Sequence, residues 1–302
     1  SWADLSLSTK MASKRDNVEK LLEELREPSL KAAEIELKNL NDFAHKNGFN
    51  TNYKLQPWDI SYWAELLRKE QFNLDQEALR PWFPLEDVLK GLFRLCEKLF
   101  DIKVVEANGE APVWNKDVLF FNIFNDSNNK IASFYLDPFS RPESKRGGAW
   151  MDECLNKNID SEGNNTIPVA YLVCNQTPPS KNKPSLMSFE EVQTLFHEFG
   201  HGLQHMLTTI DLPQAAGINN VEWDAVELPS QFMENWCFDK KTLLNIAKHY
   251  ETGEKLPEED YEKLCANRTF NCGMGTLRQL HFAITDLRLH SNLSYYQKLN
   301  SD

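Results

Sequence analysis

Two histidines and a glutamate stand close together in the segment His197-Glu198-Phe199-Gly200-His201. Residues four apart lie on one face of a helix, so both imidazoles can reach the same metal ion. Glu198 lies about 100° further round the helix, where its carboxylate can meet a water molecule held by that metal. This arrangement binds zinc and activates water, and it is typical of a metallopeptidase.

The residues around this segment predict a helix. Ser188 and Glu191 have the spacing of a capping box, in which each side chain bonds to the backbone of the other residue. Asp211-Leu212-Pro213 predicts the end of the helix. Between the two, apolar residues recur at helical spacing at Val192, Leu195, Phe196, Phe199, Leu203 and Met206.

A catalytic zinc site needs a third protein ligand and leaves a fourth position for water. The acidic candidates that follow the histidines are Glu222, Asp224, Glu227 and Glu234. Their spacing alone does not separate them. Glu227 is our leading candidate, and Asp224 or Glu234 would then orient the histidines by hydrogen bonding.

His205 needs separate treatment because it follows His201 at the same interval of four residues. No glutamate stands at the second position between these two histidines. We therefore expect His205 to be structural or to orient the metal ligands. The other histidines have no comparable partner pattern, and we expect ordinary surface or core roles for His45, His249, His281 and His290.

Helices are predicted on the N-terminal side of these residues. Residues 4–48 have the pattern of two helices separated by Pro28 and ended by Gly48. Pro57 and Pro84 each open a further helix. We expect the apolar residues of these helices to form core, at Trp58, Ile60, Trp63, Leu66, Leu67, Val88, Leu89, Leu92, Leu95 and Leu99.

Strands are predicted between residues 113 and 177. Residues 118–124 and 130–136 flank the turn Asp126-Ser127-Asn128-Asn129 and predict a β-hairpin. Residues 167–173 predict a third strand, and Pro168 favours an edge position because proline lacks a backbone donor. An extended peptide could pair with such an edge by strand addition.

Composition excludes several classes of protein. A chain of 302 residues with 41% hydrophobic content can bury a core, and its net charge of −12 argues against nucleic acid or an anionic membrane as partner. Six cysteines without a CxxC pair favour a reducing compartment. We find no apolar run of membrane-spanning length and no signal peptide at Ser1-Trp2-Ala3-Asp4, so we expect that any targeting segment has been removed or never existed.

Several segments together resemble the thimet oligopeptidase and oligopeptidase A family of zinc metallopeptidases, the M3 family. The resemblance covers essentially the whole chain. The matching segments are residues 197–202 (HEFGHG), 221–231 (VEWDAVELPSQ), 234–236 (ENW), 55–59 (LQPWD), 79–85 (LRPWFPL), 137–142 (DPFSRP), 145–150 (KRGGAW) and 277–280 (LRQL).

The resemblance implies a set of roles. Glu227 would be the third ligand of one zinc ion per chain, beside His197 and His201, and Glu198 would be the general base. Glu198 would take a proton from the attacking water and return it to the leaving amine. Family members cut short peptides in a deep channel and exclude folded proteins.

The fold that we expect is mainly α with a small β-sheet (α+β), built around a zincin-like catalytic core with helices before and after it. We divide the chain into a helical region at residues 1–112, a small sheet with loops at 113–180 and a helical zinc-binding region at 181–302. Residues 113–302 would form the catalytic part. The resemblance leaves the compartment open between the cytoplasm and the interior of a mitochondrion or plastid.

The chain departs from the family in length. Members are typically more than twice as long, and after the segment corresponding to residue 302 they carry a Gly-rich segment whose His and Tyr residues stabilise the oxyanion. Tyr295-Tyr296 lacks that glycine setting. Loss of such donors costs about a hundredfold in rate.

This departure leaves two alternatives to an active endopeptidase. The chain could be a shortened zinc-binding homologue that binds peptides or a partner with little or no catalysis. It could also be part of a full-length enzyme, or be completed by a second copy. Apolar faces left uncovered would favour self-association.

Overall fold

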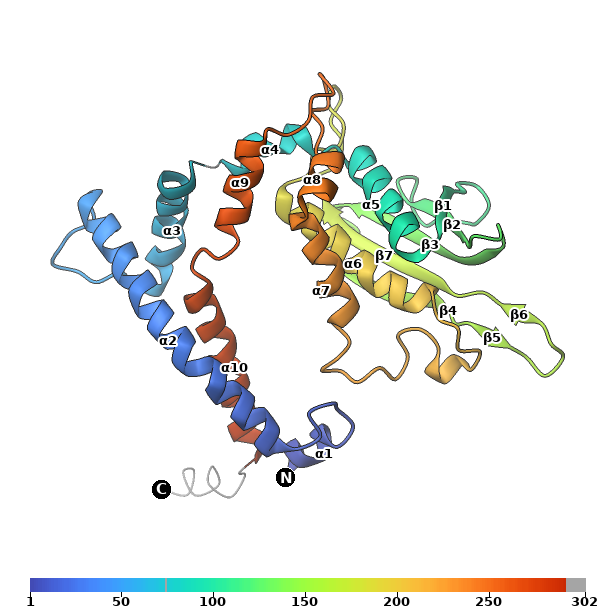
Figure 1. Cartoon of the computed structure of the whole chain (residues 1–302), viewed down its shortest axis with the longest axis horizontal. Coiled ribbons are helices and arrows are strands. Elements are labelled where there is room, and N and C mark those ends of the chain that lie inside the picture. The colour runs from blue at the N-terminus through green and yellow to red at the C-terminus, as the bar shows by residue number, and fades with distance from the viewer. Residues whose placement is uncertain (74, 292–302) are drawn as a thin grey trace. The chain divides into compact units, whose positions relative to one another are not determined.

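A computed structural model describes residues 1–73 and 75–291 (Figure 1). Tyr295-Tyr296 lies outside the described residues. The chain forms two compact units, a helical unit of residues 1–74, 222–224 and 262–302 and a mixed unit of residues 75–221 and 225–261. The predicted combination of many helices with one small sheet is confirmed, whereas the zincin-like character of the core stays a prediction.

The helices of the helical unit are α1 (Trp2–Leu7), α2 (Arg15–Lys46), α3 (Pro57–Phe72) and α10 (Cys272–Ser291). Helix α9 (Glu258–Asn267) runs from the mixed unit into it. The mixed unit contains α4 (Gln76–Leu79), α5 (Leu85–Phe100), α6 (Phe189–Met206), α7 (Leu228–Asn235) and α8 (Lys240–Ile246), with 3-10 turns η1 (Arg80–Trp82), η2 (Pro213–Ala215) and η3 (Trp236–Phe238).

The prediction that Pro28 separates two helices is wrong, because α2 runs through it for 32 residues. A proline inside a helix costs about 3 kcal/mol. Contacts with α10 on both sides of Pro28 offset this cost. After Pro28, Glu36 accepts the backbone N–H groups of Gly273 and Met274 at 2.9 and 2.8 Å. Before it, Leu22 lines a small cavity together with Leu287 of α10.

Other predicted helix boundaries are confirmed. Helix α2 ends just before Gly48, whose φ of +100° suits glycine, and Pro57 is the first residue of α3. Pro84 is the N-cap of α5. The predicted core of α5 is also confirmed, since Val88, Leu89, Leu92 and Leu95 are buried.

The prediction that Trp58 belongs to the core is wrong. Its side chain is 77% exposed, and α3 has no fully buried residue. The ring of Trp63, one and a half turns further on, meets Phe43 of α2 at a centroid distance of 6.3 Å. Helix α3 therefore contacts α2 through the side that carries Trp63, and this contact leaves Trp58 uncovered.

The sheet of the mixed unit has five strands in the order β1-β2-β3-β7-β4 (Figure 1). The predicted hairpin is confirmed, since β2 and β3 pair in antiparallel fashion. Strands β1 and β4 and a short separate hairpin, β5 with β6, were not predicted. The strands are β1 (Lys103–Glu106), β2 (Leu119–Phe124), β3 (Lys130–Phe139), β4 (Trp150–Leu155), β5 (Asn158–Ile159), β6 (Asn165–Thr166) and β7 (Val169–Gln176).

The predicted edge position of the strand at residues 167–173 is wrong. Strand β7 lies inside the sheet, parallel to β3 on one side and antiparallel to β4 on the other. Pro168 precedes the first residue of β7, so its missing N–H costs no ladder bond, and its carbonyl accepts the N–H of Ser133 at 3.1 Å. Strand β4 is one edge of the described sheet, and β1 is the other.

Helices α5 and α6 cover one face of this sheet. The ring of Phe93 on α5 contacts Phe134 of β3 and Phe199 of α6, at centroid distances of 6.3 and 6.0 Å. A Cβ placed on Gly202 of α6 would lie 3.0 Å from the Leu172 side chain of β7. Leu172 therefore points toward α6, and its neighbours along the strand point to the opposite face. None of the described helices is both long and apolar enough to cross a membrane.

Candidate functional site

Helix α6 begins as predicted. The Ser188 hydroxyl accepts the N–H of Glu191 at 3.1 Å, and the N–H of Ser188 donates to the Glu191 carboxylate at 2.6 Å. The helix ends at Met206, five residues before the predicted stop at Asp211. The capping box thus fixes where the two histidines fall along the helix.

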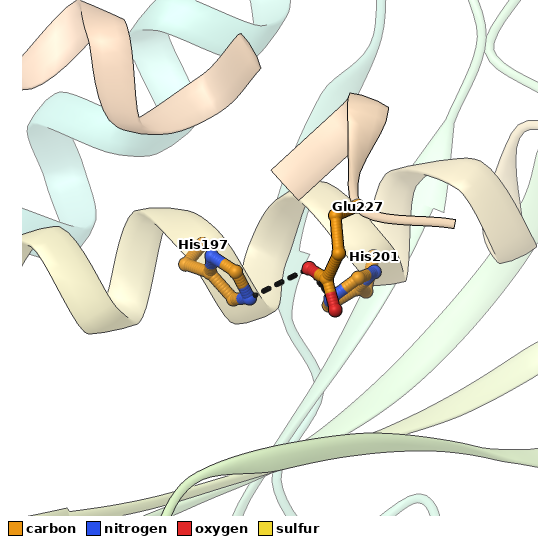
Figure 2. Close-up of side chains that lie close together, drawn as sticks. All are labelled: His197, His201 and Glu227. Atoms are coloured by element: carbon orange, nitrogen blue, oxygen red, sulfur yellow. Dashed lines mark ion pairs between the residues drawn. The ribbon is translucent and has the colours of Figure 1, made fainter. Parts of the chain in front are cut away.

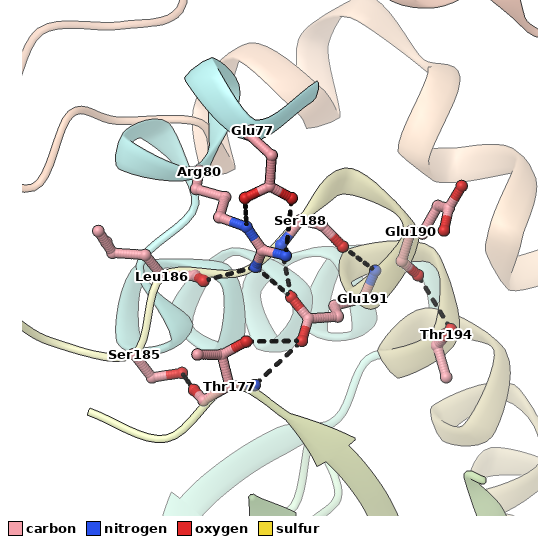
Figure 3. A network of polar contacts seen from close by, with 9 residues as sticks. All are labelled: Glu77, Arg80, Thr177, Ser185, Leu186, Ser188, Glu190, Glu191 and Thr194. Carbon is pink, nitrogen blue, oxygen red and sulfur yellow. Dashed lines mark hydrogen bonds and ion pairs between the residues drawn. The ribbon is translucent and has the colours of Figure 1, made fainter. Parts of the chain in front are cut away.

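A polar network holds this end of α6 in place (Figure 3). The Arg80 guanidinium donates to the Glu191 carboxylate at 2.8 Å and to the carbonyl of Leu186 at 3.1 Å, and it also pairs with Glu77. The other oxygen of Glu191 accepts the N–H of Thr177, just after β7, at 3.0 Å. Glu191 therefore joins the start of the helix to the end of the neighbouring strand.

Three possible metal ligands converge on α6 (Figure 2). His197 and His201 stand one turn apart, with ring centroids 4.9 Å from each other. Glu227 comes from the N-cap of α7, and its Oε2 lies 3.3 Å from Nε2 of His197 and 3.1 Å from Nε2 of His201. Among the described residues, these three form the group that could hold a metal ion.

The spacing of these atoms fits zinc. Two ligands at 2.0–2.1 Å from a tetrahedral zinc ion lie about 3.3 Å apart. The distances from the Glu227 oxygen to the two imidazole nitrogens, 3.3 and 3.1 Å, are close to this value, and all three ligand atoms lie within 4.8 Å of one another. A bound histidine must be neutral, and burial lowers the pKa of His201, which favours the neutral ring. The donor set of two imidazoles and one carboxylate is also one that zinc accepts.

Gly200 allows the two helices that carry the ligands to approach each other. A Cβ at this position would lie 2.5 Å from the Pro229 carbonyl oxygen and 2.6 Å from Cα of Ser230. Both are backbone atoms at the start of α7, so no side-chain rotation can relieve the contact. The glycine inside the motif therefore sets how closely Glu227 approaches His201.

Substitution Gly200→Ala is expected to push the start of α7 away from α6. We expect the midpoint of thermal unfolding to fall and zinc affinity to drop at least about tenfold, because the ligand atoms are displaced. Competition with a chromophoric chelator measures the affinity. Gly275→Ala is the matched control, since a Cβ there meets nothing within 4 Å. Wild-type zinc affinity in Gly200→Ala would contradict this reading of the helix contact.

Glu234 lies where an orienting group was predicted. Its Oε1 is 2.5 Å from Nδ1 of His197. A carboxylate at this distance accepts the Nδ1 proton, so the Nε2 lone pair of His197 is free and faces Glu227. Ser230, which was not predicted, plays the same part for Glu227, because its buried hydroxyl donates to Oε2 at 2.8 Å.

Glu234→Gln is expected to weaken zinc binding by about 10- to 100-fold, since loss of a partner of a ligand has this effect. The amide keeps the size of the side chain but removes its charge. Glu190→Gln removes a carboxylate that lines the same cavity and has no described contact with a histidine, so it should bind zinc normally. Equal affinities of the two variants, measured by chelator competition, would show that Glu234 does not support His197.

Glu198 is buried beside the ligands. Its side chain is 7% exposed and lines a cavity of about 430 Å³ together with Ala149, Gln193 and His197. Burial raises the pKa of Glu198 to about 7, with His197 opposing the shift and Glu227 adding to it. A carboxylate with a pKa near neutrality suits proton transfer.

The other two predicted orienting residues have different surroundings. His205 is fully buried, and its Nε2 lies 3.0 Å from the carbonyl oxygen of Leu155, so it ties α6 to the end of β4. Asp224 accepts the N–H groups of Met11 and Ala12, both at 2.9 Å, and belongs to the helical unit. Neither residue is in the group that could hold a metal.

Comparison with known proteins agrees with these observations. The family model described as "Peptidase family M3" matches residues 1–302. The chain is 53% identical over 293 residues to organellar oligopeptidase A, chloroplastic/mitochondrial, of Arabidopsis thaliana, which covers 96% of this chain and 37% of the relative. It is 52% identical to the probable cytosolic oligopeptidase A of the same plant and 44% identical to oligopeptidase A of Escherichia coli, each covering 96% of this chain. The chain spans 42% of the length of each of these two relatives.

Proposed function

Because this chain belongs to peptidase family M3, we propose that it carries the metal site of a zinc-dependent endopeptidase that hydrolyses short peptides. The observation that supports this most strongly is the convergence of His197, His201 and Glu227 beside the buried Glu198. The names of the relatives, which are oligopeptidases, support the same reaction. We also propose that residues 113–302 form a zincin-like catalytic part.

In the proposed mechanism, His197, His201 and Glu227 would hold one zinc ion. The chemistry that zinc supplies in such a site is polarisation of the scissile carbonyl and a lower pKa for the attacking water. Glu198 removes a proton from this water as the C–O bond forms. It then gives the proton to the amine nitrogen as the C–N bond breaks. Glu234 keeps Nε2 of His197 unprotonated throughout.

We propose that the peptide lies along β4 instead of along residues 167–173. Strand β4 is one of the two edges of the described sheet, and Ala149, directly before it, lines the cavity that contains His197 and Glu198. An extended peptide that pairs with this edge gains main-chain hydrogen bonds and passes close to the base. An edge strand thus supplies a site for peptide backbones of varied sequence.

The test is hydrolysis of an internally quenched peptide of about ten residues by the purified chain. We expect cleavage that stops with a chelator and returns when zinc is added. One bound zinc without any cleavage would contradict catalysis by this chain. That outcome would instead favour the alternative of a zinc-binding homologue that holds peptides or a partner.

The relatives are named as organellar and cytosolic proteins, and we propose the cytoplasm or the interior of a mitochondrion or plastid for this chain. We also propose self-association through the helical unit, where Trp58, Ile35 and Phe282 are 77%, 63% and 54% exposed. Sedimentation velocity over a range of concentrations would check this.

A further inference from the structure

A second cavity, of about 450 Å³, lies on the face of the sheet opposite α6. Tyr171 and Val173 of β7 line it, and they flank Leu172, which points toward α6. Trp114 and Trp150 also line the cavity and are 50% and 46% exposed, so both rings have free surface. We call this the outer-face cavity.

The outer-face cavity carries an excess of positive charge. Arg141, Lys145 and Arg146 line it with a single carboxylate, that of Asp137. Asp137 is 1% exposed and accepts hydrogen bonds from Arg141 at 2.8 Å, from Lys145 at 3.1 Å and from the Trp114 indole at 2.9 Å. Burial opposes ionisation of Asp137, but these three donors outweigh it and lower its pKa. The Asp137 carboxylate is therefore charged and already hydrogen-bonded to these three side chains.

Two of the three basic side chains, Arg141 and Lys145, already have hydrogen-bond partners. Arg141 pairs with Asp137, and Asp117 also acts on it electrostatically. Lys145 donates to the carbonyl of Phe139 at 2.8 Å and also to that of Cys174, so it joins the ends of β3 and β7. Arg146 differs, because no described acidic residue forms an ion pair with it. The Asn175 side-chain amide donates to the Arg146 carbonyl oxygen at 3.0 Å and holds the loop. The Arg146 guanidinium has no ion-pair partner among the described residues.

The geometry of β4 connects this cavity to the proposed peptide path. Ala149 lines the cavity of the metal site and Trp150 lines the outer-face cavity. These two consecutive residues therefore lie against cavities on opposite faces of the sheet. Side chains directly opposite each other on paired strands share a face, with Cβ atoms about 5 Å apart. The peptide residue opposite Trp150 would therefore point to the outer-face cavity, and its two neighbours would point toward the metal.

We propose that the outer-face cavity is a specificity pocket for an acidic side chain of the peptide, which Arg146 pairs with while the ring of Trp150 covers its stem. This inference rests on the proposed function and on peptide binding along β4. Pairing along β4 recognises only the backbone of the peptide, and this pocket would add a preference for one side chain. One acidic residue, at a fixed distance from the cleaved bond, would be favoured.

The test uses fluorescein-labelled peptides of eight residues in which Glu, or Gln as the matched neutral residue, occupies each position in turn. Binding is measured by fluorescence anisotropy to the zinc-loaded Glu198→Gln chain, which prevents turnover. We expect Glu to bind about fivefold more tightly than Gln at one position and equally at the others. Added Arg146→Gln should remove this preference and weaken binding of the Glu peptide more than binding of the Gln peptide.

Lys130→Gln is the matched control, because it removes one positive charge from an exposed residue at the start of β3. It should keep the preference for Glu. Equal binding of Glu and Gln peptides at every position, or equal effects of the two substitutions, would overturn the pocket. Cleavage of the Gln peptides by the unsubstituted chain without any preference for Glu would overturn the pocket alone, whereas no binding or cleavage of any peptide would overturn the proposed function with it.

Discussion

Glu227→Gln is expected to weaken zinc binding by more than about a hundredfold. Loss of a partner of a ligand already costs 10- to 100-fold, and Glu227 would be a ligand itself. The amide keeps the size of the side chain and can still accept the hydrogen bond from Ser230. The substitution therefore removes the charge between the two histidines and leaves the start of α7 intact.

Chelator competition measures the affinity, and thermal unfolding gives an independent check. Zinc at a hundred times its Kd should stabilise the unsubstituted chain by about 2.7 kcal/mol, and the variant at the same concentration should show little of this gain. Glu222→Gln is the matched control, since Glu222 was an equal candidate by spacing. Strong binding in Glu227→Gln, or loss of binding in Glu222→Gln, would contradict the ligand assignment.

Glu198→Gln is expected to reduce peptide hydrolysis by about 10²- to 10⁴-fold, which is the usual contribution of a general base. Its side chain is buried beside His197, but it is not one of the three converging groups. Zinc affinity should therefore stay within a few-fold of the unsubstituted value. Rates on a quenched peptide at equal zinc occupancy measure the effect, with Glu190→Gln as a control that should remain active. Full activity in Glu198→Gln would remove this residue from the mechanism.

Local sequence patterns predicted helix α6 well. A capping box and a regular apolar spacing depend on residues within a few turns of each other, so the start of α6 and the shared face of His197 and His201 followed from them. The hairpin of β2 and β3 followed from its turn in the same way. These features need no knowledge of distant contacts.

Other features depended on contacts outside the local segment. Pro28 stays inside a helix because α10, more than 200 residues later, contacts α2 on both sides of it. Strand β7 is interior because β4 pairs with its other side, and Pro168 falls just outside the ladder. Residue propensity alone predicted a helix break at Pro28 and an edge position for the strand at Pro168.

The proposed third ligand shows the same limit within the site. Spacing left Glu222, Asp224, Glu227 and Glu234 open, because the segment between α6 and α7 has little regular structure. Two contacts separate these acids in the structure. Gly200 lets the start of α7 approach α6, and Ser230 holds the Glu227 carboxylate toward the histidines. The glycine in the motif was a usable signal, since its lack of a side chain permits such an approach.

X-ray absorption at the zinc edge, on the chain loaded with one equivalent of zinc, shows which residues hold the metal. We predict two imidazole nitrogens at about 2.0–2.1 Å and carboxylate oxygen at about 2.0–2.2 Å, with no sulfur ligand. In Glu227→Gln the signal of paired imidazoles from bound zinc should be lost. A sulfur ligand in the unsubstituted chain, or fewer than two imidazoles, would contradict a site built from His197, His201 and Glu227.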